Sequence, residues 1–217
     1  MITRTLLTGL LAGLAAGIVF SALYVAGIEP LILSAEAFEQ GVDHAVSAPF
    51  LRIAETILFN ILTGVAYGLL LAAALVMHGH PTGIGKGVLW GIAGFAAFTL
   101  APGAGLPPEL PGTFAAPLED RQLWWVLTAG ATAGGIALLV FAPRHPLKGA
   151  GAILVLLPHI VGAPHPESVG GTPPPELAAR FVGLSFGAMA LFWVVLGGVA
   201  GYCHDRFAGK VEEEARA

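Results

Sequence analysis

The chain has little charge and almost no cysteine. Only 11% of its 217 residues are Asp, Glu, Lys or Arg, against about 25% in soluble globular domains. This deficit excludes an ordinary soluble domain, and the 56% hydrophobic content excludes a disordered chain, which needs low hydrophobicity and high charge. The one cysteine, Cys203, excludes an intrachain disulfide and a metal cage built from several thiolates.

Basic residues and nucleotide-binding motifs are also scarce. The ten lysines and arginines are spread thinly and the formal net charge is −4, whereas a nucleic-acid partner would require a basic stripe. The segment 83–87 (GIGKG) resembles a phosphate loop only in part, because it lacks the GxxxxGK[ST] spacing. We therefore expect no nucleic-acid partner, no ATP site, no tightly bound cofactor and no enzymatic activity.

Six long apolar runs are present instead. A helix needs about 20 apolar residues to cross the hydrocarbon core of a bilayer, and these runs lack the period-2 alternation of barrel strands. We predict an all-α integral membrane protein with one transmembrane domain over residues 1–217. It is a bundle of about six transmembrane helices, or of five, since the third and fifth runs are weaker. The expected spans are 5–28, 53–77, 83–100, 122–142, 148–162 and 177–202, with 203–217 as a short cytoplasmic tail.

The first run is expected to be a retained span, because a cleavable signal sequence has a shorter apolar core of roughly 7–15 residues. The loops between spans differ in charge. Loops 29–52, 101–121 and 163–176 are rich in Glu and Asp, whereas most lysines and arginines lie on the opposite side. The positive-inside rule then places both termini in the cytoplasm and the acidic loops outside the cell membrane.

A threefold pattern runs along the chain. Each odd-numbered helix ends in a proline, followed by a Glu and then by an Arg that opens the next helix. This pattern suggests three helical hairpins arranged as parallel repeats, although outward loops of any membrane protein collect Pro and Glu. The three sets are Pro30, Glu39 and Arg52; Pro102, Glu109 and Arg121; and Pro158, Glu167 and Arg180.

Glycines at four-residue spacing recur in the runs. Small residues let membrane helices approach closely, so we expect these glycines to pack the bundle, with a subunit interface such as a homo-oligomer contact as the alternative. The pairs and triplets are Gly9, Gly13 and Gly17; Gly64 and Gly68; Gly87 and Gly91; Gly130 and Gly134; Gly183 and Gly187; and Gly197 and Gly201.

The outer loops carry candidate metal ligands. His159 lies in an apolar run, and an ionisable side chain at such a position is by default a functional hypothesis. Imidazole together with carboxylate suits Co²⁺, Ni²⁺ or Zn²⁺, and acidic loops concentrate cations. A capping or interhelical hydrogen bond of His159 is the alternative. The candidate metal ligands are His159, His165, Glu109, Glu167, Glu36 and Glu39.

Several of these stretches resemble one known family. Residues 100–112 (LAPGAGLPPELPG), 121–125 (RQLWW) and 157–166 (LPHIVGAPHP) are similar to signatures of the CbtA family of predicted cobalt transporter subunits. The last helix, with Phe192-Trp193 and Leu196-Gly197, is similar as well. The likeness extends over most of the chain.

The resemblance implies a membrane protein that moves Co²⁺ for cobalamin synthesis, together with a small single-span partner, CbtB, that carries histidines. Family members often have a longer, histidine-rich first outer loop, whereas this one keeps only His44. The leading hypothesis is therefore the membrane component of a cobalt, or similar divalent metal, uptake system. The alternatives are a non-transporting membrane scaffold and a transporter of a small organic solute.

Overall fold

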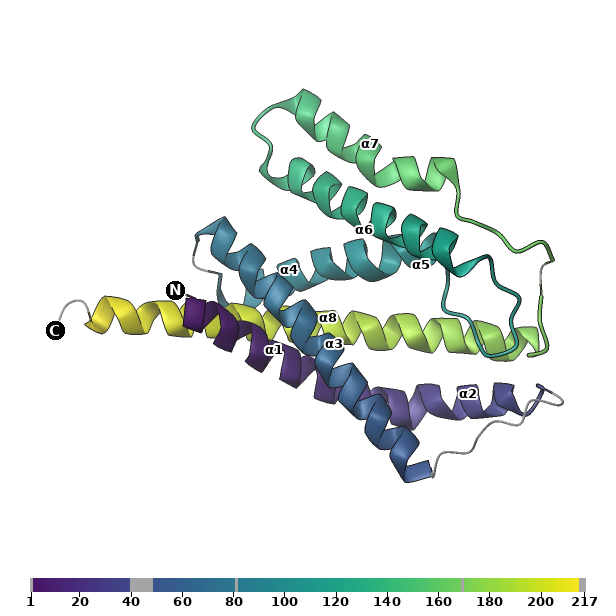
Figure 1. The fold of residues 1–217 in the computed structure, drawn as a ribbon. Helices are drawn as coiled ribbons and strands as arrows, with labels where there is room; N and C mark the ends of the chain where they lie inside the picture. The colour runs from purple at the N-terminus through teal and green to yellow at the C-terminus, as the bar shows by residue number, and fades with distance from the viewer. Residues whose placement is uncertain (1, 40–48, 81, 169, 215–217) are drawn as a thin grey trace. The chain divides into compact units, whose positions relative to one another are not determined.

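The computed structural model describes residues 2–39, 49–80, 82–168 and 170–214, and these are almost entirely helical (Figure 1). Two of the elements, η1 and η2, are π-helical turns inside longer continuous helices. In chain order the elements are α1 (Ile2–Leu23), η1 (Tyr24–Ile28), α2 (Glu29–Glu36), α3 (Pro49–His78), α4 (Gly83–Phe95), η2 (Ala96–Leu100), α5 (Ala101–Gly105), α6 (Leu118–Phe141), α7 (His145–Val161) and α8 (Pro175–Glu214).

Within the described residues, five helices are long and apolar enough to cross a membrane. The sixth apolar helix, α7, has 17 residues and extends about 25 Å, which is shorter than the roughly 30 Å hydrocarbon core. These helices confirm the predicted all-α membrane protein with five to six spans. The five long helices are Ile2–Glu36, Pro49–His78, Gly83–Gly105, Leu118–Phe141 and Pro175–Phe207.

Two predicted helix ends are wrong, because the prolines that were expected to end these helices do not end them. The first helix continues past Pro30 to Glu36, and the third continues past Pro102 to Gly105. In a regular α-helix, a proline ring clashes with the carbonyl four residues earlier. For Pro30 that carbonyl belongs to Ala26, and for Pro102 it belongs to Phe98. Each of those residues lies at the centre of a π-helical turn, η1 or η2, whose wider coil accommodates the ring. Each turn ends two residues before its proline.

The first two members of the predicted threefold pattern therefore share one local geometry. The third proline, Pro158, lies in the last turn of α7, a helix with no π-helical turn between His145 and Val161. The predicted C-terminal boundary also differs. Helix α8 runs unbroken through residue 202 to Glu214, so the predicted tail begins as a continuation of the last span.

The residue contacts divide the chain into two compact units, which are described separately. Unit 1 comprises Met1–Gly27, Asp43–Ile92 and Gly187–Ala217, and unit 2 comprises Ile28–Val42 and Ala93–Phe186. The single transmembrane domain expected from the sequence stays a prediction.

In unit 1, α1 packs antiparallel against α3 through glycine. A Cβ added at Gly9 would lie 2.7 Å from Leu69 Cα, and one at Gly17 would lie 2.8 Å from Ile61 Cα. Gly13 and Gly64 sit between them, each against the other's backbone. No side chain larger than hydrogen fits at these positions, which confirms the packing role predicted for this stripe.

Helices α4 and α8 form a second antiparallel pair of the same kind in unit 1. Gly87 and Gly91 of α4 lie against Gly197 and Trp193 of α8, so that an added Cβ would overlap backbone atoms. At the end of this pair, the Asp205 carboxylate accepts a hydrogen bond of 2.8 Å from the Thr82 backbone N–H, which precedes the first residue of α4. This contact links residues 123 apart in the chain.

Aromatic side chains fill the space between the helices of unit 1. Trp193, which is 1% exposed, has its ring centroid 5.0 Å from that of Tyr67. Phe192 meets Phe20 and Tyr67 edge to face at 5.9 and 6.2 Å. These contacts join α1, α3 and α8 into one core.

Not every predicted glycine stripe is used for packing. Among the residues that the structure describes, nothing lies within 4 Å of where a Cβ would be at Gly130 and Gly134 of α6 or at Gly183 and Gly187 of α8. In unit 2 it is instead Gly135 of α6 that meets α7, where an added Cβ would lie 2.7 Å from the Gly151 carbonyl oxygen.

Candidate functional site

Three segments of unit 2 that the sequence predicts to lie outside the membrane meet at one end of its helices. They are residues 36–39 after α2, residues 106–117 between α5 and α6, and the described residues of 162–174 between α7 and α8; we call them together the loop cap. The Phe114 N–H donates to the Gly170 carbonyl at 2.9 Å, and the Thr172 N–H donates to the Gly112 carbonyl at 3.1 Å. The Glu39 side chain lies beside Gly112, with its Cγ 3.2 Å from where a Cβ would be.

Glycine makes this cap possible at two points. Gly112 has φ +79° and lies against Thr172 and Glu39, so that any side chain there would be both strained and blocked. Gly162 has φ +89° and turns the chain sharply where α7 ends. The loops that the sequence predicted to share one side of the membrane therefore do come together in this unit.

An ion pair fastens the cap to α6. The Arg121 guanidinium donates to the Glu109 carboxylate at 2.6 Å, and each side chain is 29% exposed. Arg121 lies in the first turn of α6, so the pair fixes loop 106–117 to the start of that helix. Glu109, predicted as a metal ligand, is thereby neutralised by a cation and would have to leave Arg121 to bind a metal.

His159 lies in the last turn of α7. Its ring is exposed and meets Trp124 of α6 edge to face, with ring centroids 6.0 Å apart. Trp124 is itself wedged against Gly105 and loop 162–174, because an added Cβ at Gly105 would lie 2.8 Å from the indole Cζ2 and 2.9 Å from Ala163 Cβ. His159 is thus at the rim of the loop cap rather than deep in a span.

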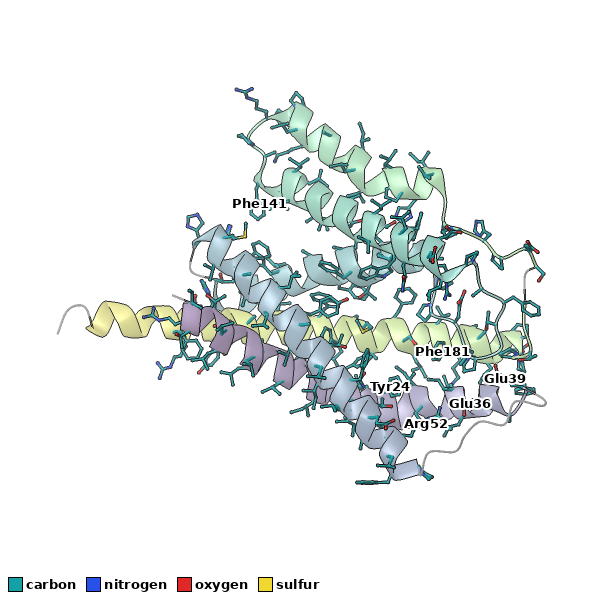
Figure 2. All side chains as sticks on the ribbon, in the orientation of Figure 1. Tyr24, Glu36, Glu39, Arg52, Phe141 and Phe181 are labelled. Carbon is teal, nitrogen blue, oxygen red and sulfur yellow. The ribbon has the colours of Figure 1, made fainter. Side chains whose placement is uncertain are left out.

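The other predicted ligands are spread around the same cap. Glu36 ends α2 and Glu39 follows it closely, as Figure 2 shows. His165 and Glu167 are exposed in the loop after α7. Among the described residues, no three His, Cys, Asp or Glu side chains are placed so that they could hold one metal ion. His44 lies outside the described residues. The assigned ligand set stays a prediction.

The sequence reading missed a polar stripe on α6. The Trp124 indole N–H and the Thr128 and Thr132 hydroxyls are buried, and none has a hydrogen-bond partner in the part of the chain that the structure describes. A buried polar group left unpaired costs about 1–3 kcal/mol. The sequence contained the signal for this stripe, because three residues with an N–H or O–H group in the side chain recur at four-residue spacing on the fourth predicted span.

One pattern that resembles a nucleophile motif is present but lacks the required geometry. Residues 183–187 read GLSFG, which has the GxSxG spacing. In hydrolases the serine of that motif sits on a sharp strand-to-helix turn, whereas Ser185 lies in the middle of the continuous helix α8. The motif is therefore not a nucleophile elbow.

Comparison with known proteins agrees with the signatures in the loop cap. A family model described as "Probable cobalt transporter subunit (CbtA)" matches residues 2–205. A search of curated proteins and a search of solved structures returned no match. The long apolar helices agree with a multi-pass membrane protein. Because the family match covers nearly the whole sequence, the chain belongs to the CbtA family of cobalt transporter subunits.

Proposed function

We propose that this chain is the membrane component of a divalent cation uptake system whose cargo is Co²⁺ and whose product serves cobalamin synthesis. It lies in the cytoplasmic membrane with both termini in the cytoplasm and the loop cap outside. A small single-span partner of the CbtB type completes the system, and the chain itself can form a homo-oligomer.

The observation that carries this proposal is the convergence of the acidic outer loops in the loop cap. Glu39, from the first outer loop, lies beside Gly112 of the second, which in turn pairs with the third at Thr172. Carboxylates from separate loops are thereby held at one end of unit 2, where their field raises the local concentration of cations. Family membership independently names cobalt as the cargo.

The carboxylates and imidazoles of the cap can take successive parts in capture. Glu36, Glu39 and Glu167 attract the hydrated ion, and the imidazoles of His165 and His159 offer neutral nitrogen ligands, which suit Co²⁺ better than alkaline-earth ions. Glu109 holds the loop through Arg121 and can join the ligands if that pair opens. His159 is the last of these successive ligands, because it lies where α7 meets the loop cap.

Metal binding to the purified chain, titrated with Co²⁺, Ni²⁺ and Zn²⁺, tests the capture site directly. His159→Ala should weaken Co²⁺ binding and lower cobalt uptake by cells. His145→Ala is the matched control, because His145 begins the same helix at its opposite end. Normal uptake by His159→Ala at normal expression would remove His159 from the site. Co²⁺ bound only when the single-span partner is present would assign the ligands to that partner.

The scaffold alternative predicts a different pattern. A subunit that only binds partners would tolerate His159→Ala and Glu109→Gln in cobalt uptake assays. Bulky replacements at Gly197 or Gly201 would not identify such a scaffold, because both glycines pack against α4 within this chain and their replacement would disturb folding first. A small organic solute as cargo would leave uptake of the metal unaffected by either histidine change.

A further inference from the structure

Helix α6 carries a polar stripe that no contact in unit 2 explains. Trp124, Thr128 and Thr132 are 8%, 0% and 2% exposed, and the indole N–H and both hydroxyls have no hydrogen-bond partner among the described residues. The three residues follow one another at four-residue intervals and so form one line of about 12 Å along the helix. Buried polar atoms in native proteins nearly always have partners, so this line points to a partner that arrives from outside the chain.

The stripe lies where α6 meets α7. At one end of the line, Trp124 touches His159 of α7; beyond the other end, Gly135 touches Gly151 and Val155 of the same helix. Thr128 and Thr132 fall between these two contacts on the same helical face. The turn η2 contacts α6 alongside, where Phe98 meets Trp125.

The covering helix α7 is suited to moving away from this face. It is the shortest of the six apolar helices, and Gly151 and Pro158 are its only residues buried among those described. Pro158 has no N–H, so the carbonyl of Leu154 lacks its usual helical donor and adds a further polar atom to this helix. Gly162, with φ +89°, joins α7 to the loop that follows.

The chemistry of the polar stripe suits a hydrated metal ion better than a dehydrated one. A threonine hydroxyl both donates and accepts, whereas an indole N–H only donates and cannot ligate a cation. The two hydroxyls can accept hydrogen bonds from the water shell of a divalent ion, and the hydroxyls and the indole N–H can donate hydrogen bonds to waters behind it. They do not form the charged, fixed ligand set that would retain the ion.

We propose that the face of α6 formed by Trp124, Thr128 and Thr132 lines the passage of the hydrated metal ion through unit 2, and that the passage opens when α7 moves off α6. This proposal rests on the transport function proposed above. The passage begins where the proposed capture site ends, because His159, the last proposed ligand, contacts Trp124 at the end of the line of hydroxyls nearest the loop cap. Because Thr128 and Thr132 are buried in this structure, it corresponds to the closed form of the proposed passage.

Cysteine accessibility tests the passage without reference to cargo. In the full chain carrying Cys203→Ser, Thr128→Cys and the control Leu127→Cys are treated in cells with a positively charged methanethiosulfonate. The two positions are adjacent, but Leu127 is 60% exposed on the outside of the helix. We expect Thr128→Cys to react at least about tenfold faster, because a thiol facing lipid does not ionise, and Co²⁺ should slow its reaction.

Equal rates, or no reaction at Thr128→Cys in cells whose wild-type protein accumulates cobalt, would overturn the passage. Rapid labelling of Thr128→Cys, in cells whose wild-type protein accumulates no cobalt, would support the passage along α6 but overturn the assignment of Co²⁺ as its cargo. These two failures are therefore distinguishable.

A pair of near-isosteric changes tests the hydroxyls themselves. Thr128→Val and Thr132→Val should each lower the rate of cobalt uptake by about tenfold, the effect of one lost hydrogen bond, whereas Thr128→Ser should restore most of it. The thermal stability of the valine variants should be unchanged or higher, because an unpaired hydroxyl has been removed. Uptake at the wild-type rate by both valine variants would show that the hydroxyls only pack.

Discussion

Units 1 and 2 differ in the contacts that hold their helices together. In unit 1, glycines of α1, α3, α4 and α8 place helix against helix with no side chain between, and large aromatic side chains close the core. In unit 2, helix α6 buries polar groups that have no hydrogen-bond partner among the described residues, and loops joined by backbone hydrogen bonds and by the Glu109–Arg121 ion pair cover one end. The comparison indicates that unit 1 resists deformation, whereas unit 2 contains the groups that can change partners.

The strongest test of this comparison adds one methyl group in each unit. Gly87→Ala places a Cβ against the backbone of Gly197 and should destabilise the protein by about 1–3 kcal/mol or more, as overpacking does. Gly134→Ala, on an α6 face with nothing within 4 Å among the described residues, should change the stability by about 0.5 kcal/mol or less, because the added methyl group meets no neighbour. Thermal unfolding in detergent measures both.

A fall in stability of the same size for both variants would mean that the open face of α6 is packed in the folded protein. The contrast between the units would then be lost. Gly13→Ala provides a second test in unit 1, since its Cβ would meet Val65 and Gly64 of α3.

An intermediate effect is expected at the polar contact of unit 1. Asp205→Ala removes the acceptor for the Thr82 N–H at the start of α4 and should cost about 0.5–2 kcal/mol, the usual range for a helix N-cap. Asp205→Asn keeps an acceptor oxygen and should retain most of the stability. Denaturant unfolding of the two variants beside wild type checks this, and equal losses would show that charge rather than the hydrogen bond matters.

The smallest effect is expected from the ion pair of unit 2. With both side chains 29% exposed, Arg121→Ala should cost about 1 kcal/mol or less, because solvent screens such pairs. A double-mutant cycle with Glu109→Gln isolates the pairwise energy. The loop cap should nevertheless loosen, which increased proteolysis within loop 106–117 would report. A coupling energy near zero together with an intact loop would show that the backbone bonds alone hold the cap.

The sequence predicted the apolar helices well because their signal is local. Runs of apolar residues mark a helix whatever surrounds it, so the six helices appear where expected. Proline gives a local signal too, but Pro30 and Pro102 were misread as helix ends, since a π-helical turn can absorb the clash without ending the helix. Whether the helix ends at the proline or continues past it depends on how much the following residues are stabilised by being helical.

The candidate site was less predictable because it depends on which segments meet. Glu109 and Arg121 stood out in the sequence as parts of a repeat, but their spacing does not reveal that they pair with each other. The Gly87 and Gly130 stripes have the same spacing, yet the first is packed and the second is open. His159 was expected near the end of the short fifth span, and it lies in the last turn of α7.

The glycine contacts between α1 and α3 also have an entropic consequence. Glycine disfavours helices in water because its backbone loses more freedom on folding than that of any other residue. In a bilayer each span must be helical before it meets its neighbour, since unpaired backbone groups are not tolerated there. That freedom is already lost on insertion, and glycine has no rotamers left to freeze. Docking Gly9, Gly13 and Gly17 onto α3 therefore orders nothing further at these positions.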